Sequence, residues 1–174
     1  MSDTVMSVIA IFLAAVLMFI FPLMSTADRG DDISQQEVQS ETQQFVDKVR
    51  STGKITQNDY DNFLSAIAQT GNSFDVEMEA KILDENSRKK TQQASSSKVG
   101  ANNYYSEYTS QIESVLKDQG VYLLKEGDIV SVSVKNTNKT ISQMLKNFFY
   151  QVTGNSTYNI AATAGGVVNV DVSK

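Results

Sequence analysis

Apolar residues fill the start of the chain almost without interruption. Residues 5–24 carry no charge, and only Ser7, small alanines and Pro22 separate the large apolar side chains. About 20 such residues in a helix span roughly 30 Å, the thickness of the hydrocarbon core of a bilayer. The pattern predicts a hydrophobic helix over residues 1–27 in a membrane or an equally apolar surrounding. A cleaved signal peptide is the alternative, but it normally begins with Lys or Arg and has a shorter apolar region.

The rest of the chain, residues 28–174, is amphipathic and predicts one extracytoplasmic α+β head domain. Helices are expected to begin at capping patterns that start with Ser34, Thr56 and Thr140, because a Ser or Thr there accepts a bond from the backbone three residues later. Apolar residues at helical spacing follow each cap. The predicted helix faces are Val38, Thr42, Phe45, Val46 and Val49; Tyr60, Phe63, Leu64, Ile67 and Ala68; Tyr104, Tyr105, Tyr108, Ile112, Val115 and Leu116; and Ile141, Met144, Leu145, Phe148 and Phe149.

Alternating apolar and polar residues predict strands between these helices. Residues 74–82 alternate strictly, residues 121–124 and 129–134 flank a turn at Gly127, and residues 158–162 and 167–172 flank Gly165-Gly166 as a terminal hairpin. The valine-rich last strand is expected at a sheet edge. Residues 84–100 hold few apolar side chains and predict a loop. This order predicts an antiparallel sheet packed with amphipathic helices on one face.

Composition narrows the classes of function that this chain can have. The chain has 174 residues with 15 Lys plus Arg against 20 Asp plus Glu, and this acidic balance argues against a nucleic-acid partner. It contains no Cys and no His, which excludes thiol nucleophiles, His-based triads and thiolate metal sites. Asp75, Glu77 and Glu79 alternate on one predicted strand, which is more typical of a solvated face than of a metal site. No enzyme activity, cofactor or metal is expected.

The N-terminus resembles the mature N-terminus of type IV pilins and related pseudopilins, because an acidic residue, Asp3, precedes an apolar helix with a proline at position 22. The acid stands two residues before the glutamate of that family, and the first residue is Met where the family has Phe. Residues 45–56, 70–72 and 76–77 also resemble membrane proteins of Tad-type pilus machineries. The resemblance implies a helix that first lies in the membrane and then packs into a filament core, with the acid pairing with the N-terminal amine of a neighbour.

Five residues are candidates for assembly contacts. Asp3 could select one axial stagger between bundled helices, because a wrong register would leave its charge unpaired in a low dielectric. The alternative is that Asp3 is solvated in the headgroup region beside the helix. Pro22 could kink the helix for packing or end it near the interface. The candidate aromatic contacts are Phe12, Phe19 and Phe21.

The expected function is a structural subunit of an extracellular pilus-like filament that assembles through its hydrophobic helix. Its partners would be other copies of the chain, the membrane before assembly and the pilus assembly machinery. It would lie in the inner or cytoplasmic membrane first and at the cell surface afterwards. The alternative is a solitary membrane-anchored module of a secretion or pilus machinery, which would favour a flexible polar stalk. The polar break at residues 25–32 is short, which favours the filament subunit.

Overall fold

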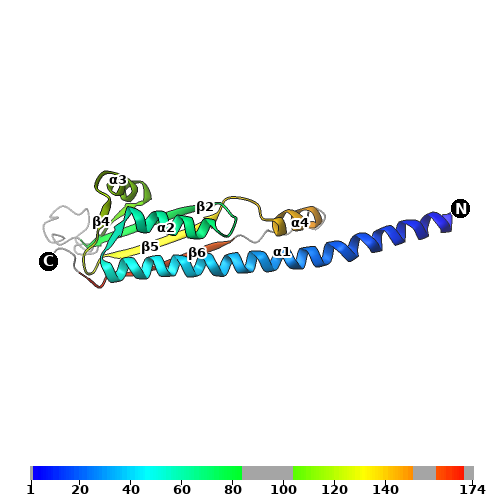
Figure 1. Ribbon diagram of the computed structural model, residues 1–174, viewed down its shortest axis with the longest axis horizontal. Coiled ribbons are helices and arrows are strands. Elements are labelled where there is room, and N and C mark those ends of the chain that lie inside the picture. Colours follow the sequence, from blue (N-terminus) through cyan, green and yellow to red (C-terminus); the bar gives the residue numbers. More distant parts are fainter. Residues whose placement is uncertain (1, 84–103, 151–159, 171–174) are drawn as a thin grey trace, which may run out of the picture.

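The computed structural model describes residues 2–83, 104–150 and 160–170. One long helix, α1 (Ser2–Thr52), runs the length of the molecule. Its C-terminal half packs along an α+β head, and its N-terminal half projects from the head on its own (Figure 1). The predicted fold class, a long hydrophobic N-terminal helix followed by an antiparallel sheet with amphipathic helices, is confirmed.

The predicted break in α1 is wrong. Residues 25–32 are helical, Ser34 lies inside the helix instead of capping a new one, and Pro22 does not end it. A helix that is already formed on both sides needs no new nucleus to continue, so a few polar residues and one glycine cost less than a second helix start. The boundary between residues 27 and 28 therefore lies within one helix, where exposed apolar residues give way to Asp28.

The head contains a four-stranded antiparallel sheet in the order β3-β2-β5-β6. Its strands are β2 (Phe74–Leu83), β3 (Tyr104–Tyr108), β5 (Ile129–Asn136) and β6 (Ala161–Val167). A separate two-stranded sheet joins β1 (Lys54–Thr56) to β4 (Val121–Leu123). The strands at residues 121–124 and 129–134 were correctly predicted, but they pair with other strands and not with each other.

Helices α1 and α2 (Gln57–Ala68) cover one face of the sheet (Figure 1). The apolar face of α1 predicted from the sequence is buried: Val38 and Val46 are fully enclosed, and Phe45 stacks on Phe63 of α2 with ring centroids 4.6 Å apart. Val130, Val132 and Val134 of β5 meet them from the sheet. The opposite face carries the exposed Asp75, Glu77 and Lys81, so the strict alternation of residues 74–82 is confirmed.

Two of the predicted caps form as expected. The hydroxyl of Thr56 accepts a hydrogen bond from the backbone N–H of Asp59 at 3.1 Å, at the start of α2. Thr140 and Gln143 bond reciprocally at the start of α4 (Ile141–Tyr150): Gln143 N donates to Thr140 Oγ1 and Thr140 N to Gln143 Oε1, each at 3.2 Å. Short sequence motifs therefore fix these two helix starts.

The prediction of one helix through the tyrosines was wrong for its first half. Residues 104–108 form strand β3, and α3 (Thr109–Gln119) begins only after them. Tyrosine favours strands, and β3 pairs its backbone with β2 from Glu79↔Tyr108 to Leu83↔Tyr104. The second half was correct, because Ile112 and Leu116 are buried and Gly120 ends α3 in the left-handed conformation, with φ of 75°.

The terminal hairpin was also wrong. Gly165 and Gly166 lie inside β6, which is an edge strand, and Val168–Val170 does not form a second strand. A Cβ at Gly166 would lie 2.5 Å from Nε of Arg50, so glycine leaves room for the Arg50 side chain against the strand. The predicted loop at residues 84–100, the strand start at Tyr158, Val172, and the side chains of Phe148 and Phe149 lie outside the described residues.

Candidate functional site

The N-terminal half of α1 exposes apolar side chains on every side of the helix. Phe12 is 68% exposed, Phe19 75% and Phe21 63%, and each would be buried in an ordinary protein core. Phe12 and Phe19 are about two turns apart and share one side, whereas Phe21 lies on another. The other large apolar residues of this surface are Val5, Met6, Val8, Ile9, Ile11, Leu13, Leu17, Met18 and Leu23.

This surface has the length and composition to cross a membrane, as an anchor or a signal sequence would. A helix that is apolar all round is stable only where no side of it faces water. We name residues 4–27, which carry no charge, the apolar segment.

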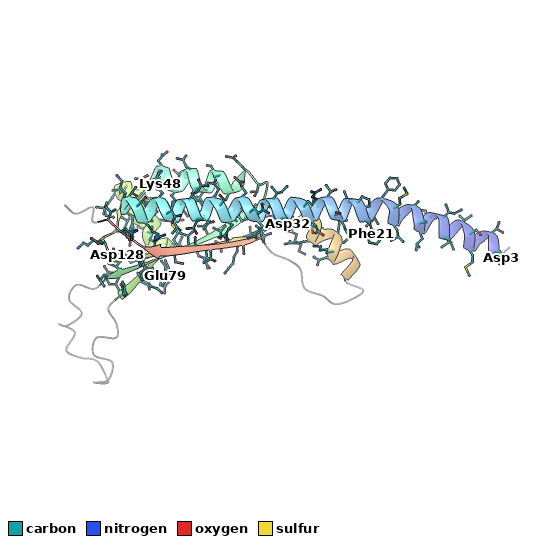
Figure 2. All side chains as sticks on the ribbon, turned by 90° about the horizontal axis from the view of Figure 1, so that it is seen from below. Asp3, Phe21, Asp32, Lys48, Glu79 and Asp128 are labelled. Carbon is teal, nitrogen blue, oxygen red and sulfur yellow. The ribbon has the colours of Figure 1, made fainter. Side chains whose placement is uncertain are left out.

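Asp3 lies at the free end of α1, far from the head (Figure 2). It is exposed and stands in the first turn, where its carboxylate interacts favourably with the positive end of the helix dipole. Ser7 donates its hydroxyl to the backbone carbonyl of Asp3 at 2.8 Å. Asp3, Pro22 and the three phenylalanines therefore lie at different points along one helix. They do not form a pocket together.

Pro22 stands inside α1, where it cannot donate a backbone hydrogen bond. One turn later, Thr26 donates its hydroxyl to the carbonyl of Pro22 at 2.9 Å. The helix stays continuous across this site and is gently curved (Figure 1). A proline is tolerated here because the surrounding turns remain intact.

A polar junction joins the base of the apolar segment to α4. Asp28 accepts hydrogen bonds from the hydroxyl of Ser142 and from Nζ of Lys146, the latter at 2.6 Å. These two bonds, led by that from Lys146, hold the pKa of Asp28 below its usual value of 3.8, although partial burial acts in the opposite direction. One turn further along α1, the buried Asp31 accepts a bond from Thr140 at 2.7 Å.

The junction was not predicted from the sequence. The sequence places Asp28 and Asp31 in a polar break and Ser142 in a capping pattern, and it does not bring them together. The bonds connect residues more than 100 positions apart, as in Asp31 to Thr140 with a separation of 109, and short-range spacing carries no signal for such a contact. The burial of Thr140, Ser142 and Gln143 at this helix start is visible only in the folded chain.

A second set of contacts holds β6 against α1. The side-chain amide of Gln35 bonds the backbone of Ala161 twice, donating to its carbonyl at 2.6 Å and accepting from its N–H at 2.9 Å. Nε of Arg50 donates to the carbonyl of Val167 at 3.0 Å, at the other end of the strand. The outer edge of β6 is thereby occupied at both ends by α1.

A hollow of about 500 Å³ opens on the head between β2, α3 and β4. Tyr122 lines it and donates its hydroxyl to Oε2 of Glu107 at 2.7 Å. Burial, and then this hydrogen bond, raise the pKa of Tyr122 far above its usual value of 10. Asp128, also at this hollow (Figure 2), accepts bonds from the backbone N–H groups of Leu83 and Lys125. The raised pKa keeps the Tyr122 hydroxyl protonated near neutral pH, and the carboxylates of Glu107 and Asp128 are engaged in structural hydrogen bonds.

Among the residues that the structure describes, no group of three or more carboxylates is placed to hold a metal ion. Comparison with models of known protein families, with curated proteins and with solved structures finds no match to this chain. The apolar segment and its polar junction with α4 are thus the candidate functional site.

Proposed function

We propose that this chain is the structural subunit of a pilus-like filament, held in a membrane by its apolar segment before assembly. In the filament, the apolar segments of neighbouring subunits pack against one another and the heads form the outer surface. The observation that carries the proposal is the apolar segment itself, which projects from the folded head as a rigid continuation of its central helix (Figure 1).

The size of the apolar surface supports this proposal. Burying one large apolar side chain contributes roughly 1.5–3 kcal/mol. A dozen such residues on the segment, which includes Phe12, Phe19 and Phe21, therefore represent on the order of 20 kcal/mol. That exceeds the stability of a typical domain, about 5–15 kcal/mol. The surface must be covered by lipid or by protein, and a subunit that passes from one to the other keeps it covered throughout.

The continuity of α1 favours a filament subunit over a solitary anchored module. A module on a flexible stalk can reorient freely above the membrane. Here residues 25–32 are helical, and Lys146 and Thr140 of the head hold Asp28 and Asp31 of α1, so the head keeps a fixed direction relative to the apolar segment. A fixed direction is what a repeating helical array of heads requires.

Asp3 supplies the register in this proposal. Its carboxylate would lie among apolar helices in the filament core, and the favourable stagger is the one in which the amino terminus of a neighbouring chain pairs with it. An unpaired carboxylate in such a surrounding costs several kcal/mol. A one-turn slip between neighbours would leave the charge unpaired.

The test is assembly in cells that produce the full chain. Surface material is sheared, imaged by electron microscopy and identified by mass spectrometry, including the mass of its N-terminal peptide. We expect filaments that contain this chain, and a large loss of filaments in the Asp3→Ala variant with an unchanged amount of the chain in the membrane. Asp32→Ala is the matched control, because it removes an exposed carboxylate from the same helix at the head end.

Normal filament yield from Asp3→Ala would reject the register role of this residue. If the chain remains in the membrane fraction and no sheared filament contains it, the filament proposal fails and the membrane-anchored module is the better description.

A further inference from the structure

Among the described side chains of α4, two large apolar residues face outward and two polar residues are buried. Ser142 is 1% exposed and Gln143 4%, whereas Ile141 is 62% exposed and Met144 52%. An amphipathic helix on a water-soluble domain has the opposite arrangement, with the apolar side against the core. The outer side of α4 therefore faces a surrounding other than water in the working protein.

The polar side of α4 is held firmly by α1. Thr140 bonds the buried Asp31, and Ser142 and Lys146 bond Asp28. These bonds fix the rotation of α4 about its own axis, because turning Ile141 and Met144 inward would break them and leave the carboxylates of α1 without these partners. The outward apolar side is thus a consequence of the fold and not of a loosely attached helix.

The position of α4 along α1 identifies what covers it. Asp28 is the first charged residue after the apolar segment, so it marks the level at which a bilayer core ends. From Thr140 beside Asp31, α4 passes Asp28 and runs toward the N-terminal end of the molecule while slanting away from α1 (Figure 2). Its exposed Ile141 and Met144 lie at the same end of the head, within the depth of the headgroup region that begins where the apolar segment ends.

We propose that α4 is an interfacial helix that rests in the headgroup and acyl boundary of the bilayer crossed by the apolar segment. This inference rests on the membrane stage of the proposed function. The apolar side enters the lipid surface as Ile141 and Met144, while the polar side stays bound to α1. The head is then supported on the membrane by two elements and holds one orientation before assembly.

Helix α4 itself recognises lipid by apolar burial and not by charge. The one basic side chain of α4, Lys146, lies 2.6 Å from Asp28 and is largely enclosed, with 22% of its side chain exposed. Binding to anionic headgroups needs free Lys or Arg side chains on the polar face of an interfacial helix. Insertion of α4 should therefore already occur in neutral vesicles, and the exposed Arg29 and Lys139 beside the junction can add an attraction to anionic headgroups.

The test uses fluorescence, because the chain contains no tryptophan. Three full-length variants, Met144→Trp, Phe19→Trp and Leu123→Trp, are reconstituted separately into phosphatidylcholine vesicles that contain lipids brominated either near the headgroup or near the end of the acyl chain. Leu123 is the matched control, since it is an exposed apolar residue (59%) on β4 of the head. Phe19 reports the apolar segment.

We expect the emission of Met144→Trp to be quenched at least about twofold more than that of Leu123→Trp, and more by the shallow bromine than by the deep one. Phe19→Trp should be quenched strongly by the deep bromine. This quenching of Met144→Trp should not require phosphatidylglycerol in the vesicles.

The outcomes separate this inference from the proposed function. If Phe19→Trp is quenched but Met144→Trp is quenched no more than Leu123→Trp, α4 does not enter the interface and the inference is wrong, while the membrane stage stands. A blue-shifted Met144→Trp emission without quenching means that protein, such as a second copy, covers α4, which also overturns the inference. Absence of quenching at Phe19→Trp contradicts the membrane stage itself.

Discussion

Asp128 is a buried carboxylate that ties three parts of the head together. It is 1% exposed, and its two oxygens accept bonds from the backbone N–H of Leu83, at the end of β2, and of Lys125, in the turn before β5. Its own carbonyl accepts a bond from Val168 at 2.8 Å, after β6. One side chain therefore supplies the acceptor for two backbone N–H groups in a partly buried region.

We expect Asp128→Ala to lower the free energy of unfolding by about 2–4 kcal/mol, because two backbone N–H groups lose their acceptor. Urea denaturation of the full chain in detergent micelles, followed by circular dichroism, measures the change. Glu126→Ala, an exposed residue in the same turn, is the control and should change stability by less than about 0.5 kcal/mol. Equal losses in both variants would contradict the role of Asp128.

Gly30, unlike Asp128, is a residue that the fold does not require. It lies inside α1, and a Cβ added there would meet no atom within 4 Å. We expect Gly30→Ala to stabilise the helix by about 1 kcal/mol, since alanine loses less backbone entropy. Slower amide exchange at residues 28–34 would show it. Gly166→Ala should instead destabilise the head, because its Cβ would lie 2.5 Å from Nε of Arg50.

At the scale of elements, α1 and α2 are joined by a charged contact as well as by their apolar faces. Lys48 of α1 lies 2.6 Å from Asp59 of α2. The hydrogen bond from Lys48 is the main reason that the pKa of Asp59 lies below its usual value of 3.8. A carboxyl with a lowered pKa in the folded state contributes stability above its unfolded pKa and loses it as the pH falls through the folded value.

The contact between Lys48 and Asp59 should therefore weaken below about pH 4, at a cost of less than about 1 kcal/mol because Lys48 is largely exposed. We expect Asp59→Asn to flatten the fall of the urea midpoint in this acidic range. Asp61→Asn, an exposed change on the same helix, keeps the contact and should behave as the parent chain. An equally steep fall in Asp59→Asn would show that other carboxyls control acid stability.

The elements that the sequence predicted well are those whose signal is local. Thr56 and Thr140 start helices because the cap and its partner lie three residues apart, and the alternation of residues 74–82 is a property of one strand. The errors arose where a distant partner decided the outcome. Ser34 satisfies the local pattern of a cap, but α1 was already helical on both sides of it, and the tyrosines of residues 104–108 pair with a strand that lies about 25 positions earlier.

At the scale of the whole molecule, the apolar segment could be found from the sequence, because a long run without charge needs no structural context. Its candidate residues Pro22, Phe12, Phe19 and Phe21 lie on it and Asp3 lies just before it, all of them exposed along one helix. The junction of Asp28 and Asp31 with α4 could not be found, since its partners follow more than 100 residues later.

That junction changes where the head can be separated from its helix. A chain that starts at Ala27 keeps Asp28 and Asp31, and we expect it to be water-soluble, monomeric and cooperatively folded. A chain that starts at Ile33 lacks both carboxylates, so α4 should exchange its amide protons at least about tenfold faster. Analytical ultracentrifugation and hydrogen exchange measure the two properties. Polymerisation of the chain that starts at Ala27 would contradict assembly through the apolar segment.

In the language of polymer chemistry, the two ends of the four-stranded sheet differ in reactivity. Gln35 and Arg50 cap the first and last residues of β6 on its outer edge, whereas within the described residues the outer side of β3 pairs with no strand. Ribbon growth consumes two edges per chain, so partial capping of one edge hinders propagation. The contacts of α1 with β6 therefore disfavour extended cross-chain sheets between crowded heads.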